Sequence, residues 1–91
     1  MNAARRKAIK TIALQLDQLK EEIETCMAEV EGVKDEEQDA FDNLPESLQE
    51  TERGEVMSIA IDNLDIASSD LESILSSLDD VISNLSDASG D

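Results

Sequence analysis

Apolar residues recur along the first half of the chain in alternating steps of three and four, from Ile9 to Leu44. This spacing is typical of a helix with a narrow coiled-coil seam. The first column of the seam, here called the Ile9 column, comprises Ile9, Leu16, Ile23, Val30, Glu37 and Leu44. The second, the Ile12 column, comprises Ile12, Leu19, Cys26, Val33 and Ala40. The pattern predicts a helix over about residues 3–42.

A second heptad pattern begins at Ala60 and has three apolar columns. The Leu64 column comprises Leu64, Leu71, Leu78 and Leu85. The Ile61 column comprises Ile61, Ser68, Leu75 and Ile82. The Ala60 column comprises Ala60, Ala67, Ile74 and Val81. Three columns make a wider stripe than a two-stranded seam needs. We predict a helix over about residues 51–86, followed by a frayed end at 87–91.

Pro45 separates the two helical patterns. Proline lacks an N–H and disfavours helical geometry in the residue before it, so the first helix should end near residues 42–44. We expect a turn over about residues 43–50 that contains a short helical turn from Pro45 to Gln49. Thr51 can cap the second helix. An apolar plug should close this end, formed by Phe41, Leu44, Leu48 and Met57.

The fold class that follows is all-α: a long antiparallel two-helix hairpin that forms a single domain over residues 1–91. Residues whose numbers sum to about 101 should face each other. We expect the core or oligomer seam to contain Ile12, Leu16, Leu19, Ile23, Cys26, Val30, Val33, Ile61, Leu64, Leu71, Leu75, Leu78, Ile82 and Leu85. A hairpin buries little surface, and one apolar column of the second helix is left over. We therefore expect two hairpins to dimerise into a four-helix bundle; the alternative is a monomer that completes its core on a partner.

The amino-acid composition excludes several classes of protein and of functional site. Low aromatic content and a net charge of −16 are typical of disorder, but the 40% of apolar residues follow the heptad grid, which favours helices. Without histidine, the commonest general base and the usual catalytic triad are absent. A single cysteine forms neither an internal disulfide nor a zinc cluster. We expect a protein that is not an enzyme and that holds no cofactor or metal.

Three features have competing interpretations. Cys26 on the seam is expected to fill the core as a small apolar residue rather than to act as a nucleophile. Glu37 is the one acid on the seam, where it either sets the register or extends toward solvent. The chain opens with a basic segment that we expect to pair with Asp87 and Asp91; the alternative is contact with nucleic acid or anionic lipid. This segment contains Arg5, Arg6, Lys7 and Lys10.

Acidic charge accumulates after residue 20. Residues 21–91 hold 22 acidic and two basic side chains. Over a rod of about 50 Å this is roughly one charge per 2.5 Å, against about one per 1.7 Å in duplex DNA. The alternative is an acidic surface that only maintains solubility. The outward face of the first helix is the densest part, and its candidate partner-binding residues are Glu21, Glu22, Glu29, Asp35, Glu36, Asp39 and Asp42.

Residues 40–64, AFDNLPESLQETERGEVMSIAIDNL, resemble a segment of small acidic helical-hairpin proteins of phages and prophages, most of them uncharacterised. The matching residues are Phe41 to Gln49, Glu52 to Gly54, Met57 and Ala60 to Leu64. The resemblance implies a phage origin and the cytosol of a host cell, and it carries over no catalytic residue.

These observations favour a binding protein that inhibits a host nucleic-acid-handling or defence protein, such as a nuclease, through a DNA-mimic acidic surface. Its partner would be a protein with a basic groove, not nucleic acid itself. No apolar run approaches the roughly 20 residues of a membrane span, and a free thiol without a signal sequence favours the cytoplasm. The alternative is an assembly factor that pairs with a partner helix through an apolar stripe. That stripe would contain Ile59, Ile66, Ile74 and Val81.

Overall fold

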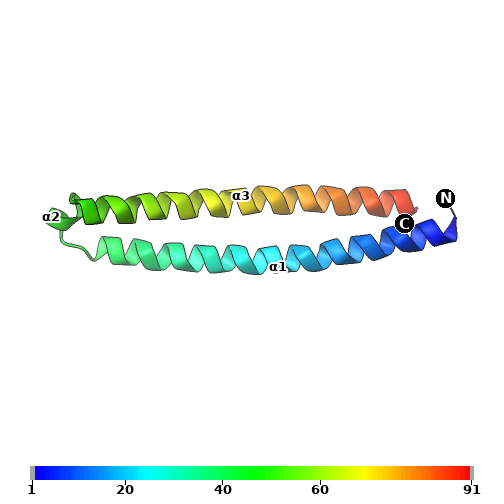
Figure 1. Cartoon of the computed structure of the whole chain (residues 1–91), viewed down its shortest axis with the longest axis horizontal. Coiled ribbons are helices and arrows are strands. Elements are labelled where there is room, and N and C mark those ends of the chain that lie inside the picture. The colour runs from blue at the N-terminus through cyan, green and yellow to red at the C-terminus, as the bar shows by residue number, and fades with distance from the viewer. Residues whose placement is uncertain (1, 91) are drawn as a thin grey trace. The chain divides into compact units, whose positions relative to one another are not determined.

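A computed structural model describes residues 2–90, and within these residues it contains helices and no strand (Figure 1). Helix α1 spans Ala3–Asp42, α2 spans Glu46–Gln49 and α3 spans Glu52–Ser89. The all-α class is therefore confirmed. Helix α3 continues three residues beyond the expected end at residue 86.

The chain divides into two compact units. The terminal unit combines Met1–Thr25 with Glu72–Asp91, and the turn unit is Cys26–Leu71. In each unit a stretch of α1 lies beside an antiparallel stretch of α3. This arrangement is consistent with the predicted helical hairpin.

Both long helices have local signals at their outer ends. The Arg5 backbone N–H donates to Asn2 Oδ1 at 2.9 Å, so Asn2 caps the first turn of α1. Gly90 follows α3 with a φ of +79°, and its N–H donates to the Asp87 carbonyl at 3.1 Å. A left-handed glycine in this position is a common way to end a helix.

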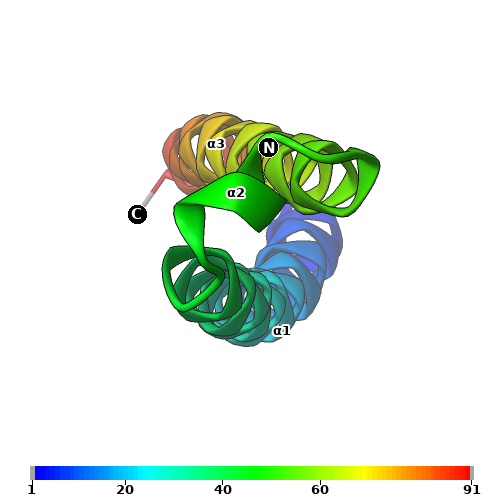
Figure 2. The same cartoon turned by 90° about the vertical axis from the view of Figure 1, so that its left-hand side faces the viewer.

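Helix α2 lies between the end of α1 and the start of α3 (Figure 2). The Gln49 side-chain amide donates to the carbonyls of Phe41 at 3.2 Å and Leu44 at 3.0 Å. These bonds hold the end of α2 against the end of α1, where the Phe41 carbonyl also accepts the Leu44 N–H at 3.0 Å. Thr51 does not cap α3 in the expected way, because its hydroxyl donates backward to the Leu48 carbonyl.

The start of α3 requires glycine at position 54. Gly54 is buried, and a Cβ atom placed on it would overlap the Gln49 backbone. Because a backbone atom cannot move aside as a flexible side chain does, the last turn of α2 can pack this closely only against a residue without a side chain. The heptad pattern gave no sign of this close approach.

The apolar plug at the turn differs from the expectation in one member. Phe41, Leu44 and Met57 are half-buried, whereas Leu48 is 40% exposed. The reason is that α2 has only four residues, and Gln49 occupies its inward-facing position.

The seam of α1 also differs from the expectation. Leu16, Ile23 and Val30 of the Ile9 column are half-buried, and so is Glu37. The Ile12 column is not in the seam of either unit: Ile12, Leu19, Cys26 and Val33 are all exposed. Its place is taken by a third set of residues, the Ala13 column, which comprises Ala13, Lys20, Met27, Lys34 and Phe41.

Two lysines explain this difference. The Ile12 column is wholly apolar, so the sequence pattern favours it over a column that contains Lys20 and Lys34. A lysine can pack its aliphatic stem in a seam while its ammonium group extends to the edge. In the structure both ammonium groups extend to aspartates of α3, and the side chains of Lys20 and Lys34 are 30% and 31% exposed.

Helix α3 contributes the Leu64 and Ile61 columns to the seam. Its half-buried residues there include Ile61, Leu64, Leu71, Leu75, Leu78, Ile82 and Leu85. Of the Ala60 column, Ala67, Ile74 and Val81 are exposed. The polar contacts between the helices join residues whose numbers sum to 99, close to the sum of about 101 that was expected for facing seam residues.

Candidate partner-binding surfaces

One side of the seam, the polar flank, is closed by contacts between charged and polar side chains. In the terminal unit, Lys20 Nζ lies 2.6 Å from Asp79 Oδ1. In the turn unit, Lys34 Nζ donates to Asp65 Oδ1 at 2.7 Å. The Ser68 hydroxyl of the same unit donates to the Glu31 carboxylate at 3.0 Å. These polar side chains of the flank therefore already have partners within the chain.

The lysines of the polar flank are electrostatically stabilised in their charged form. The pKa of Lys20 is raised, mainly by its hydrogen bond to Asp79 and then by the negative charge of that carboxylate. The pKa of Lys34 is raised chiefly by its hydrogen bond to Asp65. Both lysines remain partly solvent-exposed, so these ion pairs define the register more than they add stability.

The opposite side of the seam is apolar. In two antiparallel helices, the residues that flank the seam on one side come from equivalent columns of both helices. Lys20 and Asp79 identify the polar side of the terminal unit, which places the Ile12 column of α1 and the Ala60 column of α3 together on the other side. We call this side the apolar flank of each unit.

The apolar flank differs in composition between the two units. In the terminal unit it contains four large aliphatic residues, namely Ile12, Leu19, Ile74 and Val81. In the turn unit it is made mostly of small residues, with Cys26, Val33, Ala40, Ala60 and Ala67. Ile59 and Ile66, which the assembly interpretation also uses, are 60% and 58% exposed. They lie on the outward side of α3, opposite its seam columns.

The expected acidic surface lies away from the seam. In the turn unit, the exposed outward side of α1 carries five of the candidate carboxylates, here called the acidic face: Glu29, Asp35, Glu36, Asp39 and Asp42. Glu21 and Glu22 are exposed on α1 within the terminal unit. Among the described residues, none of these seven forms an ion pair, and only Asp42 accepts a side-chain hydrogen bond, from Gln38 at 3.0 Å. The carboxylates of the acidic face are therefore directed to solvent.

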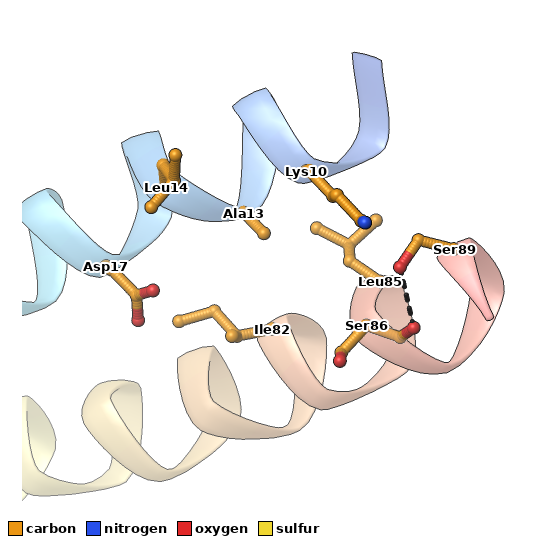
Figure 3. A pocket seen from close by; sticks show the side chains of 8 residues that line it. All are labelled: Lys10, Ala13, Leu14, Asp17, Ile82, Leu85, Ser86 and Ser89. Carbon is orange, nitrogen blue, oxygen red and sulfur yellow. Dashed lines mark hydrogen bonds between the residues drawn. The ribbon is translucent and has the colours of Figure 1, made fainter. Parts of the chain in front are cut away.

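A cavity of about 340 Å³ opens on the polar-flank side of the terminal unit (Figure 3). Its walls come from α1 and α3, with Lys10 at one end and Asp17 at the other. Ser89, which is only 3% exposed, donates its hydroxyl to the Ser86 carbonyl at 2.8 Å beside this cavity. The basic segment thus brings Lys10 toward Ser86 and Ser89, and the expected pairing with Asp91 lies outside the described residues.

Within residues 2–90, no three His, Cys, Asp or Glu side chains come together in a group that could hold a metal ion. In the same range, no helix combines the length and apolar character needed to cross a bilayer. Cys26 is a free, exposed thiol on the apolar flank of the turn unit rather than the core residue that its seam position suggested.

No protein-family model matches the chain, and no curated protein or solved structure shows significant similarity to it. The exposed surfaces themselves are thus the basis for assigning a function.

Proposed function

We propose that this protein is a non-enzymatic inhibitor that occupies the nucleic-acid-binding groove of a partner protein. The observation that carries the proposal is the acidic face, whose carboxylates are exposed and have no cationic partner among the described residues. A basic groove that normally binds phosphates offers the complementary charge. A host nuclease or another defence protein with such a groove fits this description, in agreement with the phage resemblance of residues 40–64.

The charge of the turn unit supports this proposal. This unit contains 14 acidic and two basic side chains, a net charge of −12. Its stretch of α3, residues 52–71, is about 30 Å long, which gives about one net charge per 2.5 Å. That density is of the same order as the roughly one charge per 1.7 Å of duplex DNA.

The test compares two variants with the same change in net charge. The first carries Asp35→Lys, Glu36→Lys, Asp39→Lys and Asp42→Lys on the acidic face. The control carries Asp62→Lys, Asp70→Lys, Asp80→Lys and Asp87→Lys on α3. Proteins captured from a host lysate by the wild type are identified, purified and titrated with each variant. The first variant should bind roughly tenfold more weakly or worse, and the control should change affinity much less.

Salt and competing DNA complete this test. Association should slow between low and physiological ionic strength, because screening acts beyond a Debye length of about 8–10 Å. Duplex DNA should compete for the same partner surface. The inhibitor proposal would be refuted by a partner whose affinity is unchanged by salt, by added DNA and by the four acidic-face substitutions.

A second candidate function is an assembly factor that pairs with a partner helix. The exposed aliphatic residues of the apolar flank favour it. Such binding would survive high salt, since burial of apolar surface does not depend on charge. We also propose that the protein acts as a dimer in which two hairpins form a four-helix bundle.

A further inference from the structure

The helix pair of the terminal unit leaves its apolar flank uncovered. Ile12, Leu19, Ile74 and Val81 are 46%, 44%, 49% and 44% exposed. Ile12 and Leu19 are seven residues apart on α1, and so are Ile74 and Val81 on α3. Each pair therefore lies on one side of its helix, two turns apart. These side chains make a four-residue apolar surface that extends across both helices.

The accessible surface of the chain is larger than a compact monomer would have. The total is 6472 Å², and no apolar residue is fully buried among the described residues. A compact folded monomer of 9.9 kDa is expected to expose about 5,200 Å². The excess of about 1,300 Å² is spread over the whole chain, and a second copy that covers part of it would bring the exposed surface closer to that of a compact fold.

The surroundings of this surface are compatible with a second copy of the same acidic chain. The terminal unit has nine acidic and five basic side chains, a net charge of −4, against −12 for the turn unit. On the outer border of the flank, Gln15 lies between Ile12 and Leu19 on α1, and Ser77 lies between Ile74 and Val81 on α3; Glu22, one turn beyond Leu19, is the acid on this border of α1. The neutral residues at positions 15 and 77 reduce the like-charge repulsion that two copies would experience.

We propose that the apolar flank of the terminal unit docks on the same flank of a second copy of this chain. This inference deepens the dimer proposed above and assigns it an interface: Ile12, Leu19, Ile74 and Val81. The acidic face belongs to the turn unit and is not part of this interface, so dimerisation leaves it available to a basic partner.

The experiment measures the dimer dissociation constant by sedimentation velocity over a concentration series. The variant Leu19→Asp/Val81→Asp should weaken the dimer by roughly 100-fold or more, because it places charges at the centre of an apolar interface. Circular dichroism should still show a helical chain, since both residues are about half exposed in one copy. If the aspartates unfold the chain, Leu19→Gln/Val81→Gln provides the same test with neutral, helix-compatible side chains.

Leu14→Asp and Ile66→Asp are the matched controls. Leu14 and Ile66 are 64% and 58% exposed and lie outside the proposed interface, so both variants should remain dimeric. The proposal would be overturned if the wild type stayed monomeric at all concentrations. It would also be overturned if the flank bound a helix of another protein but not a second copy of this chain. A dimer that is insensitive to both flank variants would also overturn it.

Ionic strength distinguishes this interface from the inhibitor surface. Two chains of net charge −16 repel each other, so raising salt from low to physiological concentration should tighten the dimer. The same change should weaken binding to a basic partner. If salt strengthens the dimer but no partner binds in a salt-sensitive way, the inhibitor proposal is refuted and the dimer interface is supported. If a partner binds in a salt-sensitive way but salt does not strengthen a dimer, only the proposed interface is refuted.

Discussion

The turn unit and the terminal unit use the same two helices but are held together differently. In the turn unit, Gln49 bonds to the end of α1, Gly54 lets α2 approach α3, and Lys34 pairs with Asp65, only 31 residues away. In the terminal unit the ion pair joins Lys20 to Asp79, 59 residues apart in the chain. The turn unit therefore closes through local contacts, whereas the terminal unit depends on side-chain packing between distant segments.

This difference also separates the two proposed surfaces. The turn unit carries most of the net charge and the acidic face, and its apolar flank consists mainly of small residues. The terminal unit carries little net charge and has the large aliphatic flank. Local contacts can stabilise the turn unit despite its high charge. The terminal unit has fewer local contacts, so burial of its apolar flank on a partner should add more to its stability.

The largest expected effect comes from introducing a charge into the seam of each unit. Ile61→Asp in the turn unit should abolish most of the helical circular dichroism, since it places an unpaired charge in the half-buried seam of a chain whose total stability is marginal. Leu75→Asp in the terminal unit should leave the helical signal of the turn unit, whose contacts are local. Leu75 is preferred to Leu78, because by the register an aspartate at 78 would face Lys20.

Asn63→Asp and Ser76→Asp are the controls, because each adds the same charge at an exposed position. Both should retain the wild-type spectrum. Equal loss of helix in the Ile61→Asp and Leu75→Asp variants would show that the two units unfold as one, contrary to the comparison drawn above.

A smaller effect is expected from the close contact that is specific to the turn unit. Gly54→Ala should destabilise the chain by about 2 kcal/mol or more, because the added methyl group meets the Gln49 backbone. The matched Gly32→Ala variant has open space around its Cβ and should stabilise α1 by about 1 kcal/mol. Urea denaturation measures both values. Two variants that change stability in the same direction would argue against this packing of α2 on α3.

The smallest effect is expected from high pH. Because the pKa values of Lys20 and Lys34 are raised, their ion pairs contribute fully below the ordinary lysine pKa of about 10.4 and are lost as pH rises through the raised values. The Tm should therefore fall above about pH 10. The fall should be smaller in Lys20→Met and in Lys34→Met, and unchanged in Lys7→Met. If the wild type and the three variants had identical pH profiles, the ion pairs of Lys20 and Lys34 would not contribute to the stability of either unit.

The extent of the helices and the position of the turn could be predicted from local features of the sequence. Heptad spacing indicates where each helix runs, and Pro45 restricts the backbone around it wherever the chain folds. Exposure of the acidic candidates was predictable as well, because they lie off every apolar column. Gly54 could not be identified in this way, since a close backbone approach leaves no periodic pattern.

The sequence by itself determined that this protein is helical, where α1 ends and α3 begins, and which residues of α3 form the seam. Only the tertiary structure decided which face of α1 meets α3. Spacing alone allows the Ile9 column to pair with either the Ile12 or the Ala13 column, since both are three or four residues away. The choice depends on Lys20 and Lys34, which enter the seam only because aspartates of α3 lie within reach of their ammonium groups.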